Sequence, residues 1–423
     1  MQLLTRNGQP VDEGDRGSAA HAVLWGLGRS LALEHPEIWG GIVDVDESVP
    51  AAVAAGYVLT EATSGDHEDQ VVYRAGVRRV PRLVARGPRV RPADDRLSDV
   101  GAHLVVGATG NIGPHLIRQL ADMGARTIIA VSRDPGNRLA GLTAELAARG
   151  TAVVPVAADS ADPTAMSALF ARFGDDLPPL EGVYLAAFGG GPVTLTDMSD
   201  ADVAAMFRPK LDALETLHQL TLSTPVERFV VFSSISGLTG SRWLSHYAAT
   251  TTFLDTFAYA RRAAGLPATT VNWGLWKSLD DAQGDVERQV TRESGLIPMD
   301  DATAIRALAS ISAPGSPVRS TVVAADWSTL AAAYRTRAAV RILDELLDDE
   351  VQSSDGQSRL RSELAAADAS ARLGILTDHV ASLVATVMGL SSPRELDPTT
   401  GFFQFGMDSL MTVTLQRALS DSL

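Results

Sequence analysis

The sequence of 423 residues contains no cysteine. This absence excludes disulfide bonds, catalysis by a thiolate and metal sites built on cysteine, and it agrees with a reducing compartment such as the cytoplasm. Positive charge is also scarce, because 36 lysines and arginines stand against 51 aspartates and glutamates, for a formal net charge of −15. An acidic chain of this kind is a poor partner for nucleic acid or for an anionic membrane surface.

The sequence also lacks an apolar run long enough for a membrane-spanning helix, and no basic segment followed by an apolar one opens the chain. We therefore expect no membrane insertion and a cytoplasmic location. The length indicates two or three domains. The pattern of apolar residues divides the chain into three blocks.

The first block covers residues 1–92 and carries no cluster of side chains that points to catalysis. Apolar residues at helical spacing predict a helix over 19–33, and an apolar run after two glycines predicts a strand over 40–46. Alternating residues at 71–74 and 78–83 predict two edge strands. These elements favour a structural role for the block.

The second block follows a polar, proline-containing linker and extends over residues 98–345. Strand and helix patterns alternate along it, which predicts an α/β fold with a doubly wound parallel sheet. The predicted strands cover 103–106, 127–131, 152–156, 182–186, 229–232 and 269–272.

The third block begins after residues 346–369, which are acidic and small and therefore predict an interdomain linker. Residues 370–423 contain an amphipathic helix from about 371 to 388, a proline-bearing loop and a second helical run. These features predict a partial C-terminal helical domain.

A glycine-rich loop lies between the strand at 103–106 and a helix predicted over 112–123. Glycines at such a turn let the backbone approach a pyrophosphate, and the start of the helix supplies free N–H groups. The alternative is a tight strand-to-helix turn with no ligand. The candidate cofactor-binding residues are Gly107, Thr109, Gly110, Asn111, Ile112 and Gly113.

The end of the second strand of this block indicates which dinucleotide binds. An NAD site places an acidic residue about twenty positions after the glycine loop, whereas this chain has Ser132 and Arg133 there. A guanidinium binds a 2′-phosphate, so NADPH is preferred to NADH. The alternative is that Arg133 is a solvated loop charge. Asp159, after the third strand, is placed to touch the adenine or to cap a helix.

Three further side chains suit the reduction of a carbonyl group. Ser234 follows the strand at 229–232, Tyr247 begins the next helix, and Lys210 lies upstream. A serine hydroxyl can hold a carbonyl oxygen, a phenol can protonate it, and an ammonium stabilises the phenolate that remains. Singly, each residue has a structural explanation as a strand-end cap, a core tyrosine or a solvated lysine.

Residues 101 to about 310 resemble the ketoreductase domain of type I modular polyketide synthases, which has a short-chain dehydrogenase/reductase fold of the Rossmann type. The first block resembles part of that family's structural subdomain through Trp25-Gly-Leu-Gly-Arg, and the third resembles the start of an acyl carrier domain through Gly406-Met-Asp-Ser-Leu. The motifs shared with the ketoreductase are the glycine loop, Ser132-Arg133, Lys210-Leu-Asp-Ala, Phe232-Ser-Ser, Tyr247-Ala-Ala and Asn272-Trp-Gly-Leu-Trp.

The resemblance implies that NADPH reduces a carrier-bound β-ketoacyl thioester to a β-hydroxyacyl thioester in polyketide or lipid assembly. Ser234 would hold the carbonyl oxygen, Tyr247 would protonate it, and Lys210 would tune Tyr247. Trp273 and Gly274 would line the nicotinamide end of the cofactor site.

The resemblance also implies partners. Ser409 would carry 4′-phosphopantetheine, although the motif alone also fits an unmodified helix-capping serine. The expected partners are an acyl carrier domain and other polyketide synthase domains, within a dimeric megasynthase.

The chain departs from the family pattern at several positions. Thr251 stands where the family has asparagine, and it would take over that residue's place in a proton relay. The markers of product configuration are absent, since Thr239 replaces one marker tryptophan and Trp243 is out of register with it. A rival hypothesis is therefore a scaffold that binds cofactor or carrier but is disabled for reduction by Thr251 and Phe188. A third hypothesis is a truncated synthase fragment.

Overall fold

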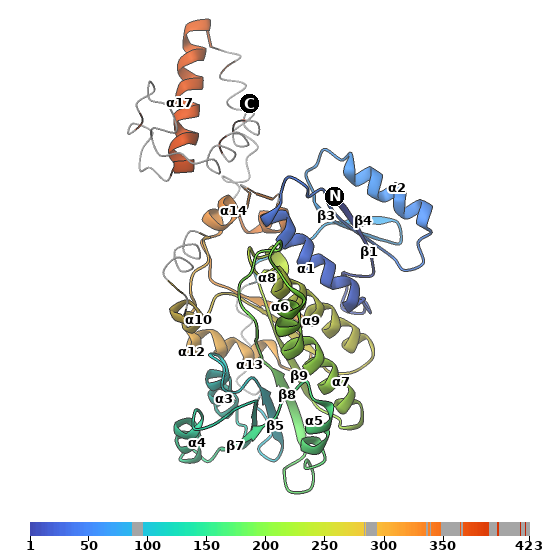
Figure 1. The fold of residues 1–423 in the computed structure, drawn as a ribbon, viewed down its shortest axis with the longest axis vertical. Coiled ribbons are helices and arrows are strands. Elements are labelled where there is room, and N and C mark those ends of the chain that lie inside the picture. Colours follow the sequence, from blue (N-terminus) through green and yellow to red (C-terminus); the bar gives the residue numbers. More distant parts are fainter. Residues whose placement is uncertain are drawn as a thin grey trace.

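The computed structural model describes residues 1–86, 96–282, 284, 294–335, 337–338 and 340–347. Near the C-terminus it also describes residues 364, 367–388, 396, 415 and 419. These residues form two sheets with their helices and one long C-terminal helix (Figure 1). The linker predicted around residues 87–96 lies almost wholly outside the described residues, as does most of the linker predicted over 346–369.

The first unit is a four-stranded sheet with two helices. Its elements are β1 (Gln2–Arg6), α1 (Ala19–Glu34), β2 (Gly41–Val45), α2 (Ala51–Ala62), β3 (Gln70–Arg74) and β4 (Val77–Arg79). The predicted helix and the strand over 40–46 are confirmed as α1 and β2. One expectation was wrong, because β3 pairs with β2 and with β4 and so is an inner strand. Of the two strands predicted at the edge, only β4 lies there, and it stops before Pro81, which has no N–H to donate.

The second unit is built on a seven-stranded parallel sheet with the order β11-β10-β9-β8-β5-β6-β7. Six of these strands were predicted from the sequence, and β11 was not. The strands are β5 (Ala102–Val106), β6 (Thr127–Ser132), β7 (Ala152–Ala157), β8 (Leu180–Leu185), β9 (Arg228–Ser234), β10 (Thr269–Trp273) and β11 (Arg319–Val322).

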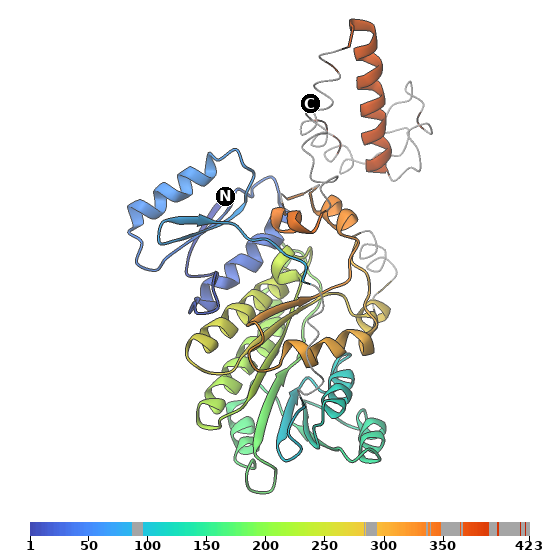
Figure 2. The same cartoon turned by 180° about the vertical axis from the view of Figure 1, so that it is seen from behind.

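Helices cover both faces of this sheet (Figures 1 and 2). On one face α3 (Gly113–Asp122) and the short helices near α13 (Leu308–Ile311) enclose an apolar core, and on the other α5 (Pro163–Phe170), α7 (Ala213–Ser223) and α9 (Ser245–Ala263) enclose a second one. The remaining helices are α4 (Ala140–Ala147), α6 (Asp200–Phe207), η1 (Arg208–Asp212), α8 (Ser236–Thr239), α10 (Lys277–Ala282), α12 (Asp301–Ala304), η2 (Ile305–Ala307), α14 (Trp327–Arg335) and η3 (Arg341–Leu346). The predicted doubly wound α/β fold is confirmed.

The two units share an interface in which α1 packs against α9. The helices approach so closely that a Cβ atom added to Gly26 would lie 2.1 Å from the carbonyl oxygen of Ala248. A backbone hydrogen bond from Leu83 to Ile342 adds a further link between the units. The first unit therefore rests directly on the helix that begins just before Tyr247.

The C-terminal part contains α17 (Ala369–Met388), which confirms the helix predicted over 371–388. Val384 and Leu415 are buried against each other with Val380, Leu383 and Leu419 around them. Ser409 lies outside the described residues. Among the residues that the structure describes, no helix is both long and apolar enough to span a membrane.

Candidate active site

The strand order changes direction between β5 and β8, because the chain builds β6 and β7 on one side of β5 and β8 to β11 on the other. Ligands of open parallel sheets bind at such a point, beyond the carboxyl ends of the strands. A cavity of about 1480 Å³ lies there, and residues following β5, β6, β8, β9 and β10 line it. The order of the strands therefore brings most of the predicted site residues to one crevice, while Gly113, Ser234 and Thr251 do not line it.

The glycine loop forms one wall of this cavity. Gly107 has a φ of +90°, and a Cβ atom there would lie 2.7 Å from the carbonyl oxygen of Ala186. Gly113 opens α3, and a Cβ atom there would lie 2.3 Å from the carbonyl oxygen of Ala108. Only glycine fits either position, which gives the motif its physical basis. The members of the loop that line the cavity are Gly107, Thr109, Gly110, Asn111 and Ile112.

The end of β6 supplies the groups that suit a phosphorylated ribose. Ser132 and Arg133 line the cavity, and Arg138, which was not predicted, lies there as well. The Ser132 hydroxyl is buried, and within the described part of the chain it has no hydrogen-bond partner. Two guanidinium groups and an unpaired hydroxyl beside a glycine loop fit the 2′-phosphate end of NADPH.

Asp159 also lines the cavity, but its carboxylate is already engaged. It accepts hydrogen bonds from Arg208 at 2.8 Å and from the Ala161 backbone N–H at 3.0 Å. The N-cap of α5 is Asp162, so the capping alternative for Asp159 was wrong. Contact between Asp159 and an adenine ring stays a prediction.

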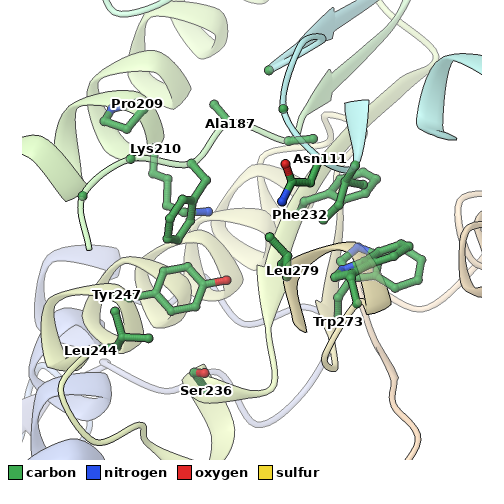
Figure 3. A pocket seen from close by; sticks show the side chains of 18 of the residues that line it. Asn111, Ala187, Pro209, Lys210, Phe232, Ser236, Leu244, Tyr247, Trp273 and Leu279 are labelled. Carbon is green, nitrogen blue, oxygen red and sulfur yellow. The ribbon is translucent and has the colours of Figure 1, made fainter. Parts of the chain in front are cut away.

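The three predicted catalytic side chains come from three separate elements and meet. Ser234 ends β9, Tyr247 lies in the first turn of α9, and Lys210 lies in η1, a π-helical turn that contains Pro209. The Ser234 side chain is close enough to the Tyr247 phenol to lower its pKa, and the Ser234 hydroxyl donates to the Ser236 hydroxyl at 3.3 Å. The Lys210 Nζ atom lies 5.3 Å from the centroid of the Tyr247 ring. Figure 3 shows the polar ends of Lys210 and Tyr247 facing the same space, across from Trp273.

Burial sets the proton affinities of this group. Burial raises the pKa of the Tyr247 phenol, and the Ser234 side chain opposes this rise. The phenol is therefore protonated at neutral pH, as a proton donor must be. Burial lowers the pKa of Lys210 to about 8, while the negative charge of Asp255 acts in the opposite direction.

Asp255 and Asn272 form a buried network that the sequence analysis missed. Asp255 accepts hydrogen bonds from the Thr270 hydroxyl at 2.6 Å and from the Asn272 amide at 2.8 Å. The same Asn272 amide donates to the backbone carbonyl of Ser234 at 3.0 Å. Asp255 follows Leu254 within the apolar run of α9, and an acidic residue at such a position was the signal that could have revealed this network.

The structure does not support the predicted relay through Thr251. Its side chain is fully buried, its hydroxyl donates to the carbonyl oxygen of Ala248 at 2.8 Å, and it does not line the cavity. Phe188, by contrast, is on the cavity wall, with its ring edge-on to Tyr247 at 5.4 Å between centroids. Trp273 and Gly274 also line the cavity, and their place at the nicotinamide end stays a prediction.

Three protein-family models match successive parts of the chain. The model of the KR domain matches residues 101–278. The model described as polyketide synthase extender module SpnB, Rossmann fold domain, matches residues 1–83, and that of the phosphopantetheine attachment site matches residues 378–423.

Known proteins extend this match. The chain is 60% identical over 421 residues to a phenolphthiocerol/phthiocerol polyketide synthase polypeptide of Mycobacterium bovis, covering 100% of this chain and 27% of that protein. It is 34% identical over 420 residues to the pikromycin polyketide synthase component PikAIII of Streptomyces venezuelae, covering 94% of this chain and 26% of that protein. The chain thus spans about a quarter of the length of these curated relatives.

Solved structures agree in both fold and sequence. A structure titled A1-type ketoreductase is 32% identical, with a TM-score of 0.74, and the match covers 82% of this chain and 73% of that one. A second, titled A-type ketoreductases from modular polyketide synthase, is 33% identical with the same TM-score, over 82% and 72% of the two chains. The chain therefore belongs to the ketoreductases of modular polyketide synthases, oxidoreductases that use NADPH to reduce β-ketoacyl intermediates, and a phosphopantetheine attachment region follows its ketoreductase.

Proposed function

We propose that this chain reduces a carrier-bound β-ketoacyl thioester to the β-hydroxyacyl thioester, with Tyr247 as the proton donor. The observation that carries the proposal is that Tyr247 and Lys210 line one cavity together with the glycine loop. Ser234 acts on the Tyr247 phenol from the end of β9, just behind the cavity wall. Each of these side chains is held by a separate element of the fold, so their arrangement is set before substrate arrives.

The roles of the residues follow from their chemistry. Bound NADPH supplies the hydride that the β-carbonyl carbon receives. Ser234 donates a hydrogen bond to the carbonyl oxygen, and Tyr247 transfers its proton to that oxygen as negative charge develops there. Lys210 then stabilises the phenolate through its positive charge. The glycine loop holds the pyrophosphate, and Arg133 with Arg138 holds the 2′-phosphate.

The substrate arrives, in this proposal, on the phosphopantetheine arm of an acyl carrier. The match of the phosphopantetheine attachment site to residues 378–423 supports a carrier following the reductase, with Ser409 as the attachment point. We further propose that the chain works in the cytoplasm as part of a dimeric synthase, together with the other domains that such a synthase contains.

The test is oxidation of NADPH in the presence of a β-ketoacyl thioester of N-acetylcysteamine. Tyr247→Phe keeps the ring and removes the proton, so we expect kcat to fall about a thousandfold, in the range measured for loss of a general acid. The dissociation constant for NADPH should stay unchanged. Tyr259→Phe is the matched control, because Tyr259 lies on the same helix and does not line the cavity.

A scaffold that binds cofactor without turnover is the second candidate, because the Phe188 ring, 53% exposed, lies against Tyr247. Saturable NADPH binding with no oxidation by the wild-type chain, and turnover restored by Phe188→Gly, would favour it. Wild-type turnover that survives Tyr247→Phe would contradict the proposed role of the phenol.

A further inference from the structure

One carboxylate of the first unit holds two loops that border the active-site cavity. Glu34 ends α1, and its Oε1 atom accepts a hydrogen bond from the Trp243 N–H at 2.9 Å. Its Oε2 atom accepts from the Leu195 N–H, also at 2.9 Å. The Val193 N–H donates to the Trp243 carbonyl oxygen at 2.7 Å and so joins the two loops to each other.

Trp243 has an unusual backbone conformation at this point. Its φ is +63°, in the left-handed region that glycine adopts easily and a bulky residue rarely does. Such a conformation persists only when the surroundings enforce it, and it is found mostly at functional sites. Here the hydrogen bonds of Glu34 and Val193 fix the peptide groups on both sides of the residue.

Trp243 lines the cavity, four positions before the proton donor Tyr247. Leu33 from the first unit, Leu244, and Tyr334 from α14 line the same cavity, as do the charged Arg242 and Arg337. The guanidinium of Arg242 stacks on the indole at 4.9 Å and supports it. The glycine loop, Ser132 and Arg133 suit the cofactor, so the part of the wall that carries Trp243 is the part left for the substrate.

We propose that Trp243, held in place by Glu34, selects the acyl part of the substrate by forming an apolar wall against which the chain beyond the β-carbon packs. The first unit then takes part in substrate selection through Glu34 and Leu33. The inference rests on the proposed reduction. It adds that the substrates of this reduction are thioesters with an extended apolar acyl chain. Trp243 is a specificity-determining residue, and Glu34 is a positioning residue that acts through it.

The experiment compares β-ketobutyryl and β-ketododecanoyl thioesters of N-acetylcysteamine with the full chain. We expect Trp243→Ala to lower the ratio of kcat/KM for the long substrate over the short one about tenfold, mainly through the KM of the long substrate. Trp243→Phe should recover most of the ratio. Trp243→Gly suits the positive φ, so it should lose selectivity without a lower melting temperature.

Glu34→Gln keeps the size of the side chain but leaves one of the two N–H groups without an acceptor. It should shift the ratio in the same direction as Trp243→Ala, and the double variant should shift it no further than Trp243→Ala does. Glu37→Gln, an exposed change just beyond α1, is the matched control and should leave the ratio unchanged.

Two outcomes would overturn this inference and leave the proposed reduction intact. The first is an equal effect of Trp243→Ala on kcat/KM for both substrates. The second is a double variant whose change in the substrate ratio is the product of the changes caused by Glu34→Gln and Trp243→Ala. Absence of turnover of both thioesters by the wild-type chain would overturn the proposed reduction, and this inference with it.

Discussion

Lys210 is a charged side chain with 3% of its surface exposed, and its proton affinity is therefore sensitive to its surroundings. Burial lowers its pKa to about 8, and the charge of Asp255 limits the decrease. The proposed mechanism needs the ammonium form, because only the charged form stabilises the phenolate of Tyr247. The residue thus titrates close to the pH at which it must act.

We expect kcat/KM to fall as the pH rises through about 8, since Lys210 is protonated below its pKa and neutral above it. Tyr247 should not contribute in this range, because burial raises its pKa. Asp255→Asn removes the charge that supports the ammonium form, so the fall should move to lower pH. Profiles of kcat/KM against pH for both proteins check this.

Thr270→Val provides the control for that experiment. It removes the hydrogen bond of Thr270 to Asp255 and leaves the carboxylate charge in place. If the Asp255 carboxylate acts on Lys210 by its charge, kcat/KM of Thr270→Val should fall at the same pH as that of the wild-type chain. An identical profile for Asp255→Asn and the wild-type chain would contradict an electrostatic role for Asp255.

Among single residues, the sequence predicted those functional side chains that stand at the end or start of a recognisable strand or helix. Ser234 ends a buried strand and Tyr247 begins the next helix, so chain order alone placed them together. Glu34 and Asp255 were not found, because their partners are distant in sequence or buried. Glu34 contacts Trp243 across 209 positions, and a glutamate at a helix end looks solvated until the tertiary structure is known.

The contact between helices α1 and α9 depends on a residue without a side chain. A Cβ atom at Gly26 would lie 2.1 Å from the Ala248 carbonyl oxygen, so the backbones would have to separate. We expect Gly26→Ala to lower the free energy of unfolding by about 1–3 kcal/mol, as overpacking does. Chemical denaturation measures this loss.

Gly56→Ala is the matched change in α2, where nothing lies within 4 Å of the added Cβ. Alanine favours the helix there, and we expect a gain of about 0.5–1 kcal/mol. Equal effects of the two substitutions would mean that α1 and α9 are not in close contact in solution.

The strands that the sequence did predict are those with continuous apolar runs, such as β9, which is buried throughout. β11 was missed because all its residues are only half-buried and it starts with Arg319. α2 was missed because its apolar residues form no single stripe, and only Ala54 and Glu61 are buried. Position within a sheet also escaped prediction, since alternation gave β3 the appearance of an edge strand.

Buried polar contacts join the first unit to the second across their interface. Arg29 donates from Nε to Gln70 in β3 at 2.8 Å and from a second nitrogen to the Gly237 carbonyl oxygen in α8. The Ser241 N–H donates to Ser30, and the Thr256 hydroxyl donates to the Gly8 carbonyl oxygen. Two sheets tied in this way should unfold as one cooperative unit.

We expect hydrogen exchange in β2 and β9 to report the same free energy of opening. Arg29→Met should lower both values together by about 2 kcal/mol, because it leaves two buried carbonyl acceptors without a donor. Exchange measured by mass spectrometry under increasing denaturant tests this. A decrease confined to β2 would show that the units unfold independently.

The three blocks could be predicted from composition and from the alternation of elements. The interface between the first two could not, because glycine, alanine and serine make much of it and they carry no charge or bulk that marks a contact surface. Gly26 and Arg29 belong to the motif that suggested the family, and their structural roles became visible only through their partners Ala248 and Gly237.

Leu33 lines the cavity and Glu34 binds Trp243 in its wall, although both residues belong to the first unit. This has a practical consequence for building hybrid enzymes. A transplant limited to residues 96–347 would carry the proton donor and the cofactor site to a new host, but it would leave part of the substrate wall behind. The recipient's own helix would then decide which chains are accepted. A graft intended to transfer both chemistry and choice of substrate should include the first unit, from β1 onward.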